Sequence, residues 1–241
     1  MSTVYMSAAR APGHRRGGTV RSNVALPLCI AGVCVVGLAL TWVVAALVPA
    51  THVKDAVALH DFTLLGGPRL DDVANALLDL LDPLLYTLWG LMLVAVALRR
   101  RRPRLALAVA LVLGLAPLTA ELLKPLLAHP HAWIGSDSDW VKAASWPSGH
   151  ATAATALALC AVLVVPSRLR LTTVVLGAMF VAGVGFSLLV LAWHLPSDVF
   201  GGYLVGTLWV ALAVACLRAY DARSVSRTPG RRVRAVGPRV P

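Results

Sequence analysis

Residues 146–150 read WPSGH, and residues 194–198 read HLPSD. Each motif stands at the edge of a long apolar run and places a histidine beside the expected start of a helix. The two motifs are separated by about one outward and one return crossing of a bilayer, because a helix of roughly 20 residues spans the hydrocarbon. The sequence therefore predicts that His150 and His194 lie at the same face of a membrane.

The composition is typical of a membrane protein. Of 241 residues, 58% are hydrophobic and 14% are charged, and the mean hydropathy is +0.76. These charges are too few to cover the outside of a soluble domain, so we expect an all-α bundle of membrane-spanning helices. The net charge of +11 resides at segment ends and in the tails, which fits membrane topology better than binding of nucleic acid. All four cysteines fall inside apolar runs, so we expect neither a disulfide framework nor a metal site.

Six apolar segments are candidates to cross the bilayer. They comprise residues 24–48, 77–98, 105–123, 151–165, 171–192 and 199–217. We expect a transmembrane domain over residues 23–218, between disordered basic cytoplasmic tails at 1–22 and 219–241. The middle of the polar interval 49–72 could form a short surface helix, and 125–147 form a polar loop. A secretory signal is the alternative for the first segment, but the apolar core of a signal is normally only ~7–15 residues long.

The distribution of basic residues predicts the orientation of these segments. All but four of the 22 Lys and Arg residues lie in the tails or in the two short turns at 99–104 and 168–170. Basic residues accumulate on the cytoplasmic side of membrane proteins, so both termini are predicted to be cytoplasmic and both motifs to face outward. The composition, rich in Ala, Val and Arg, suggests a GC-rich bacterial source and hence a plasma membrane.

The first motif has the features of an anion site at the start of a helix. Ser148 is a candidate N-cap, and Gly149 lets a ligand approach the backbone closely. The free N–H groups and the positive dipole end of a helix attract an anion. His150 could then give a proton to a leaving oxygen, because an imidazole titrates near neutrality. By itself, however, such a motif is more often a cap followed by a solvent-facing histidine.

The second motif and a lysine complete a candidate phosphoryl-transfer site. Asp198 follows His194 by four residues and could accept a hydrogen bond from one ring nitrogen, leaving the other nitrogen free to attack. Lys124 would place a positive charge against phosphate oxygens. Taken alone, Lys124 is more simply a lysine whose ammonium reaches the interface. All three groups on one membrane face favour a functional site.

These residues resemble the three-part signature of the type-2 phosphatidic acid phosphatase superfamily, which includes membrane lipid phosphatases and vanadium haloperoxidases. The resemblance rests on Lys124, on residues 147–150, and on Ser187 followed by residues 194–198. It covers roughly residues 105–217. Six spans with an external site also match the membrane members of that superfamily.

The resemblance implies a reaction through a phosphohistidine that needs no metal ion and no cofactor. His194 would attack phosphorus with the support of Asp198. His150 would protonate the leaving group and later activate water. The groups implied to hold the phosphate are Lys124, Ser148 and the Gly149 backbone.

Two positions depart from the family pattern. Where the family has an arginine followed by a proline, seven residues after the lysine, this sequence has His131 and Ala132. Where the family has an arginine after the serine, this sequence has Leu188. His129 and His131 are candidates to replace the missing arginines as cations that bind the substrate, and Lys142 lies in the same loop. A histidine, however, cannot match the two parallel hydrogen bonds that a guanidinium group donates. Loss of one such donor could cost on the order of 10²–10³ in rate.

The leading hypothesis is a phosphatase that acts on a lipid phosphate or polyprenyl (di)phosphate at the external leaflet. A catalytically silent family member that binds a lipid or a protein partner is the first alternative, and the missing arginines favour it. A phosphotransferase that passes the phosphoryl group to another acceptor is the second, because it would use the same histidine. The sequence predicts no particular oligomeric state.

Overall fold

The computed structural model describes residues 20–127 and 145–226. Within these two ranges the chain forms helices and no strand, so the predicted all-α class is confirmed. The helices are α1 (Val20–Leu47), α2 (Pro49–Thr63), α3 (Pro68–Asp79), α4 (Pro83–Arg99), α5 (Pro103–Leu126), α6 (Gly149–Val164), α7 (Arg170–Val190) and α8 (Pro196–Ser226), with a 3-10 turn, η1, at Ser167–Leu169.

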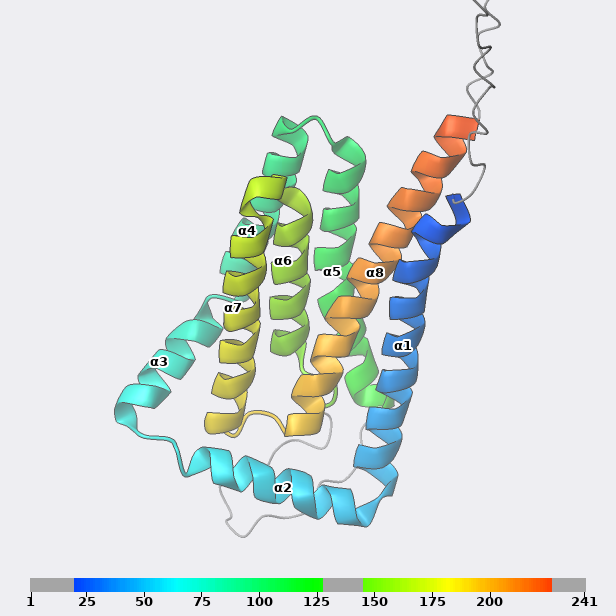
Figure 1. Ribbon diagram of the computed structural model, residues 1–241. Coiled ribbons are helices and arrows are strands. Elements are labelled where there is room, and N and C mark those ends of the chain that lie inside the picture. Colours follow the sequence, from blue (N-terminus) through cyan, green and yellow to red (C-terminus); the bar gives the residue numbers. More distant parts are fainter. Residues whose placement is uncertain (1–19, 128–144, 227–241) are drawn as a thin grey trace, which may run out of the picture.

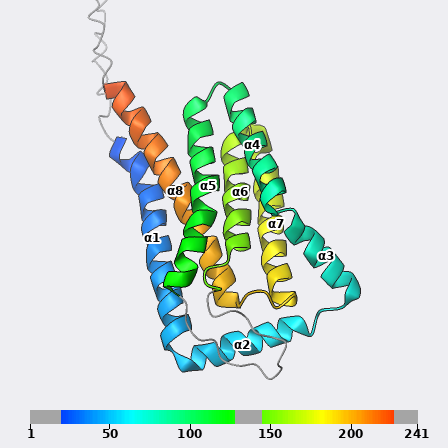
Figure 2. The same cartoon turned by 180° about the vertical axis from the view of Figure 1, so that it is seen from behind.

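Helices α4 to α8 stand side by side as a bundle, and α1 packs along α8 (Figures 1 and 2). Helix α2 lies across one end of the bundle, and α3 slants from there towards α4. The start of α1 and the end of α8 lie together at the opposite end. We call these the α2 end and the tail end. The basic turns between α4 and α5 and between α6 and α7 both lie at the tail end.

The helices have the length and composition of membrane spans. Helices α1, α5 and α8, and the continuous segment of η1 and α7, are each long and apolar enough to cross a bilayer. Helices α3 and α4 meet the same test as a pair, although they are bent by 51°. Helix α6 is apolar but has 16 residues, or about 24 Å of helix. The chain is a multi-pass membrane protein, as predicted, and the count of six spans stays a prediction.

The second predicted segment, residues 77–98, differs from the structure at its start. Helix α3 ends at Asp79, and α4 begins at Pro83 after a short turn. Proline lacks an N–H group and its fixed φ suits the first turn of a helix, so Pro83 begins a new helix at this point. The polar interval before it contains all of α2 and the start of α3, which is more helix than the short surface segment expected.

The two terminal helices extend beyond the predicted domain limits. Helix α1 already begins at Val20, and α8 continues to Ser226, although the composition predicts a tail from residue 219. At the tail end the Arg104 guanidinium lies 3.9 Å from the ring centroid of Tyr220 and 3.8 Å from the Asp221 carboxylate. These contacts hold the last turns of α8 against α5.

Two glycines let α6 and α8 approach closely beside the first motif. A Cβ atom on Gly202 would lie 2.6 Å from the Ser148 carbonyl oxygen, and one on Gly206 would lie 2.8 Å from the Thr155 Cβ. Small residues four apart are a common means of packing membrane helices tightly. The contact brings the start of α6 against the start of α8.

Two apolar clusters fill the bundle. One lies between α4, α5, α6 and α8 and includes Val109 and Cys160. The other lies where α6, α7 and α8 meet α2 and α3, and it includes Leu78, Leu188 and Leu195. Many large apolar side chains on the outer faces of α1, α4, α5 and α7 are exposed, as expected for a surface that faces lipid.

Candidate active site

The two histidine motifs meet at the α2 end and are joined by their backbones. The Ser148 N–H donates to the Asp198 carbonyl oxygen at 2.9 Å. Ser148 is fully buried, and its hydroxyl accepts a hydrogen bond from the Ala151 N–H at 3.4 Å, which confirms its prediction as the N-cap of α6. The start of α6 is therefore positioned directly by the first turn of α8.

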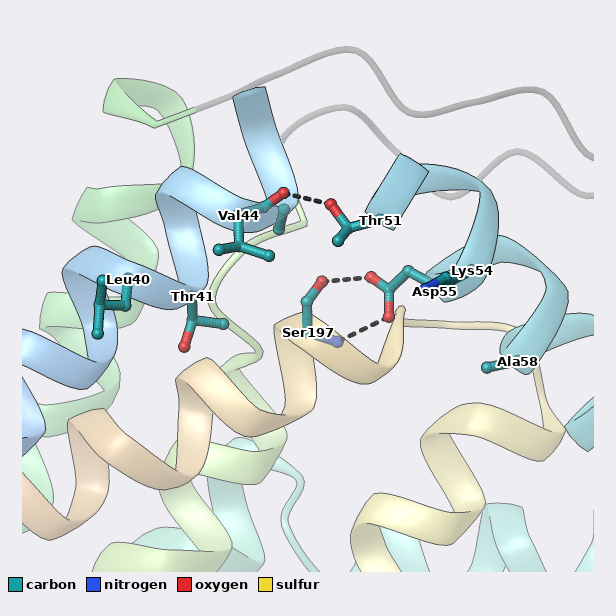
Figure 3. Close-up of a pocket in the computed structure, with 9 residues that line it drawn as sticks. Leu40, Thr41, Val44, Thr51, Lys54, Asp55, Ala58 and Ser197 are labelled. Atoms are coloured by element: carbon teal, nitrogen blue, oxygen red, sulfur yellow. Dashed lines mark hydrogen bonds between the residues drawn. The ribbon is translucent and has the colours of Figure 1, made fainter. Parts of the chain in front are cut away.

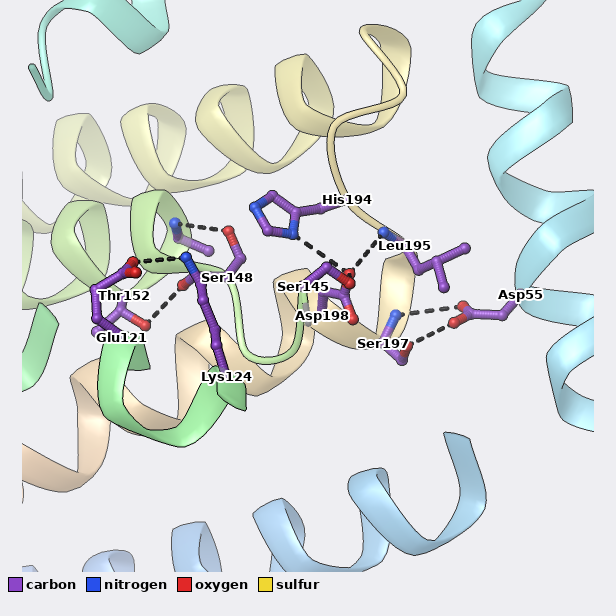
Figure 4. Close-up of polar contacts among 11 residues, drawn as sticks. Asp55, Glu121, Lys124, Ser145, Ser148, Thr152, His194, Leu195, Ser197 and Asp198 are labelled. Carbon is purple, nitrogen blue, oxygen red and sulfur yellow. Dashed lines mark hydrogen bonds and ion pairs between the residues drawn. The ribbon is translucent and has the colours of Figure 1, made fainter. Parts of the chain in front are cut away.

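Asp198 holds His194 in one orientation (Figure 4). Its Oδ2 lies 3.3 Å from His194 Nδ1, and it also accepts hydrogen bonds from Ser145 Oγ at 2.7 Å and the Leu195 N–H at 3.1 Å. The carboxyl group is fully buried. A carboxylate can only accept hydrogen bonds, so its pairing with Nδ1 places the ring proton there and leaves Nε2 with a free lone pair. This is the arrangement a nucleophilic histidine needs.

His150 lies in the first turn of α6, next to the His194 loop. Its half-buried ring makes an edge-on contact with Trp193, and the two ring centroids are 5.8 Å apart. Trp193 immediately precedes His194, so the two motif histidines come from neighbouring stretches of structure. The groups close enough to act electrostatically on the protonation of His150 include His194, Lys124, Asp82 and Glu121.

Lys124 reaches the start of α6 from the last turn of α5. Its Nζ would lie 3.7 Å from a Cβ atom on Gly149, and it forms an ion pair of 2.6 Å with Glu121 Oε1 (Figure 4). Lys124 and the N-terminus of α6 thus place positive charge at one point. The structure brings together Lys124 of α5, the start of α6 with His150, and His194 of the connection between α7 and α8.

Comparisons with known proteins identify the family that this chain resembles. The family model described as the PAP2 superfamily matches residues 105–221, a segment that contains Lys124 and both motifs. Residues 105–221 belong to the PAP2 superfamily. A search of curated proteins gives no match.

A solved PAP2 structure shares the fold. It is described as the crystal structure of the first transmembrane PAP2-type phosphatidylglycerolphosphate phosphatase from Bacillus subtilis. The two structures are similar with a TM-score of 0.61 at 20% sequence identity, over 84% of this chain and 98% of that one. The chain therefore has the fold of a PAP2 membrane phosphatase.

Leu188, at the position where the sequence comparison expects an arginine, lies directly beneath the His194 loop. Its carbonyl oxygen accepts a hydrogen bond from the Trp193 N–H at 2.9 Å. Its side chain is fully buried in the apolar cluster with Ala151 and Leu195. An apolar side chain at this position contributes packing to the loop and no charge to the phosphate site.

The other departure from the PAP2 pattern falls outside the described residues. His129 and His131, the predicted substitutes for the first arginine, lie between residues 127 and 145, as do Ala132 and Lys142. Their part in binding stays a prediction.

Sequence reasoning gave no role to three polar residues of the site. Ser145 donates to Asp198, and Asp55 of α2 accepts hydrogen bonds from both the N–H and the hydroxyl of Ser197, at 3.2 and 2.5 Å. Burial raises the pKa of Asp55, while its hydrogen bonds from Ser197 act in the opposite direction. The third residue is Glu121. Its spacing of three residues from Lys124 on one helix could have predicted their ion pair. No sequence pattern marks Ser145 or Asp55, because their partners are distant along the chain.

A pocket of about 490 Å³ opens beside the second motif (Figure 3). It lies between α1, α2 and the start of α8. Its lining residues are Leu40, Thr41, Val44, Ala45, Thr51, Lys54, Asp55, Ala58 and Ser197. Apolar side chains of α1 form one wall, and Lys54, Asp55 and Ser197 give the other side polar groups. The pocket therefore offers an apolar surface beside Ser197, next to Asp198 in the second motif.

Proposed function

We propose that this chain is a membrane phosphatase that hydrolyses a lipid phosphate or a polyprenyl (di)phosphate through a phosphohistidine. The observation that carries the proposal is the pairing of His194 Nδ1 with buried Asp198, beside His150 and Lys124. Membership of the PAP2 superfamily supports a phosphatase in general. The proposal itself adds the class of substrate and the roles of the individual site residues.

The first chemical step transfers the phosphoryl group to His194. Its Nε2 forms a bond to phosphorus while the bond between phosphorus and the leaving oxygen breaks. His150 gives its proton to that oxygen, which leaves as the alcohol of a lipid or as a polyprenyl monophosphate. Lys124 and the N–H groups at the start of α6 stabilise the negative charge on the phosphoryl oxygens.

The second step releases inorganic phosphate. The neutral His150 takes a proton from water, the water oxygen bonds to phosphorus, and the phosphorus–nitrogen bond of His194 breaks. Asp198 keeps the proton on Nδ1 throughout, so that His194 returns with a free Nε2. The enzyme ends the cycle in its starting protonation state.

The position of the site supports a lipid substrate at the external leaflet. The site lies at the α2 end, whereas the basic turns and the described chain ends lie at the tail end. By the positive-inside tendency, the tail end faces the cytoplasm of a plasma membrane and the site faces away from it. The pocket between α1 and α2 would take the first part of an apolar tail while the phosphate lies at Lys124.

Removing either histidine tests this function. We expect His194→Ala to reduce phosphate release from phosphatidate and polyprenyl diphosphate in detergent to background, and His150→Ala to reduce it by about 10²–10⁴-fold. His60→Ala, an exposed histidine on α2, serves as the control and should release phosphate at the wild-type rate. Thermal unfolding midpoints of the variants check that each one folds.

A catalytically silent protein that binds a lipid or a partner is the second candidate. The observation that favours it is the fully buried Leu188 in place of an arginine. Wild-type protein that releases no phosphate from the substrate panel, beside an active PAP2 phosphatase as control, would establish this candidate and overturn the phosphatase.

A further inference from the structure

Glu121 places a negative charge at the point where the proposed function needs a phosphate. Its Oε1 lies 2.6 Å from Lys124 Nζ. The same oxygen would lie 2.7 Å from a Cβ atom on Gly149, so it sits directly over the first residue of α6. Figure 4 shows the Glu121 and Lys124 side chains together beside the start of this helix.

A phosphate oxygen held by Lys124 and the α6 N-terminus would need this same space. Gly149 has no side chain, and Glu121 lies where a ligand would approach its backbone. The carboxylate and the phosphate are both anions, and close like charges repel each other. The two therefore compete for one set of donors.

The Glu121 side chain has the freedom to leave. It is 58% exposed, whereas that of Lys124 is 22% exposed. Rotation of Glu121 towards the solvent would cost one partly exposed ion pair, which is a weak interaction. Lys124 would stay in place and exchange the carboxylate for the phosphate.

We propose that Glu121 is an internal competitor that sets the affinity of the site for phosphate. This proposal rests on the proposed function and adds a residue to it. Glu121 lowers the affinity for the phosphate of the substrate and equally for the inorganic phosphate that the reaction produces. A weaker hold on the product speeds its release.

The alternative role for Glu121 is purely structural, namely to hold Lys124 in position for the substrate. The two roles predict opposite signs for one substitution. If Glu121 competes, Glu121→Gln strengthens phosphate binding because the displaced charge is gone. If Glu121 only positions Lys124, the same change weakens phosphate binding.

Titration calorimetry with inorganic phosphate and with orthovanadate on the full chain in detergent separates the two roles. We expect Glu121→Gln to bind both anions about 3- to 10-fold more tightly than the wild type, in line with the loss of one partly exposed ion pair. Asp61→Asn is the matched control, since it removes one charge from an exposed position of α2 and should leave both affinities unchanged. In a Lys124→Gln background the effect of Glu121→Gln should vanish, because the two residues act as a pair.

The inference is overturned if Glu121→Gln binds the anions as tightly as the wild type or less tightly. It is also overturned if neither the wild type nor Glu121→Gln binds either anion. If Glu121→Gln fails to fold, Glu121→Asp replaces it. Its shorter side chain keeps the charge but no longer reaches Gly149. An affinity for phosphate above that of the wild type supports competition, and an unchanged or lower affinity refutes it.

Phosphate release from lipid, measured on the same preparations, tests the proposed function separately. Tighter anion binding without hydrolysis would overturn that function alone, and hydrolysis with unchanged binding would overturn this inference alone.

Discussion

The carboxylate of Asp198 depends on three donors from two places in the chain. His194 and the Leu195 N–H belong to the same motif, whereas Ser145 lies 53 residues earlier. The pairing with His194 was predictable, because a spacing of four residues at the start of a helix brings two side chains together. The hydrogen bond from Ser145 was not, since a fully buried carboxylate takes its donors from whatever the fold places beside it.

Leu188 is buried in an apolar cluster, at the position where the sequence predicts that an arginine of the family pattern has been replaced. Leu188→Arg introduces a charge into an apolar cluster, and an unpaired buried charge costs about 3–5 kcal/mol. We expect a fall of several degrees in the thermal unfolding midpoint in detergent and no gain in phosphate release. Leu188→Met, which nearly conserves volume, is the control and should change the midpoint little. An unchanged midpoint together with faster release would instead show that the guanidinium reaches the phosphate.

Among the elements, α6 and α8 position the site through a contact between backbones. Gly202 lies against the Ser148 carbonyl, and the Ser148 N–H donates to Asp198 on the first turn of α8. Helix α2 supports the same turn from the other side, where Asp55 accepts hydrogen bonds from Ser197. The start of α8 is thus held between two helices that are far apart in sequence. This arrangement fixes the turn that carries Asp198 against the helix start that carries His150.

Gly202→Ala tests the contact between α6 and α8. The added Cβ would meet the Ser148 carbonyl oxygen and the Ala151 Cβ at 2.6 and 2.7 Å, so the two helices must separate. We expect a loss of stability of about 1–3 kcal/mol and a clear fall in phosphate release. Gly114→Ala on α5 is the matched control, because a Cβ there meets nothing within 4 Å. Its helix should be unchanged or slightly stabilised. Equal behaviour of the two variants would contradict the role given to Gly202.

Over the whole molecule, the distribution of charge distinguishes the two ends of the bundle. The basic turns lie at the tail end, and the candidate site and α2 lie at the other. Positive charge on one side and a polar site on the other are the pattern expected of a membrane protein with a fixed orientation. The orientation of the bundle is therefore predicted from its charge.

Labelling of introduced cysteines tests that orientation. In a chain whose four native cysteines are replaced by alanine, Asp61→Cys on α2 should react with a membrane-impermeant maleimide in intact cells. Arg102→Cys, in the turn at the tail end, should react only after the cells are opened. Both positions are exposed, so a difference in labelling reports the side of the membrane. The reverse pattern would place the site in the cytoplasm.

The sequence by itself determined the class of the fold and the identity of the chemical groups. Apolar runs of bilayer length require helices, because backbone groups in hydrocarbon must be hydrogen-bonded within the segment. Local spacing also identified Ser148 as a cap and the pairing of His194 with Asp198. The sequence did not predict that a new helix begins at Pro83, because a proline is tolerated inside a membrane helix as well as at its start.

Only the tertiary structure decided which distant groups share the site. Asp55 and Ser145 join it through contacts made after the helices have packed, and packing also places Glu121 of α5 against Gly149 of α6. Leu188 proves to be buried beneath the His194 loop. Such contacts depend on how α2, α5 and α8 are placed relative to one another. Helix placement depends on side-chain packing summed over the whole bundle, for which no short stretch of sequence carries a signal.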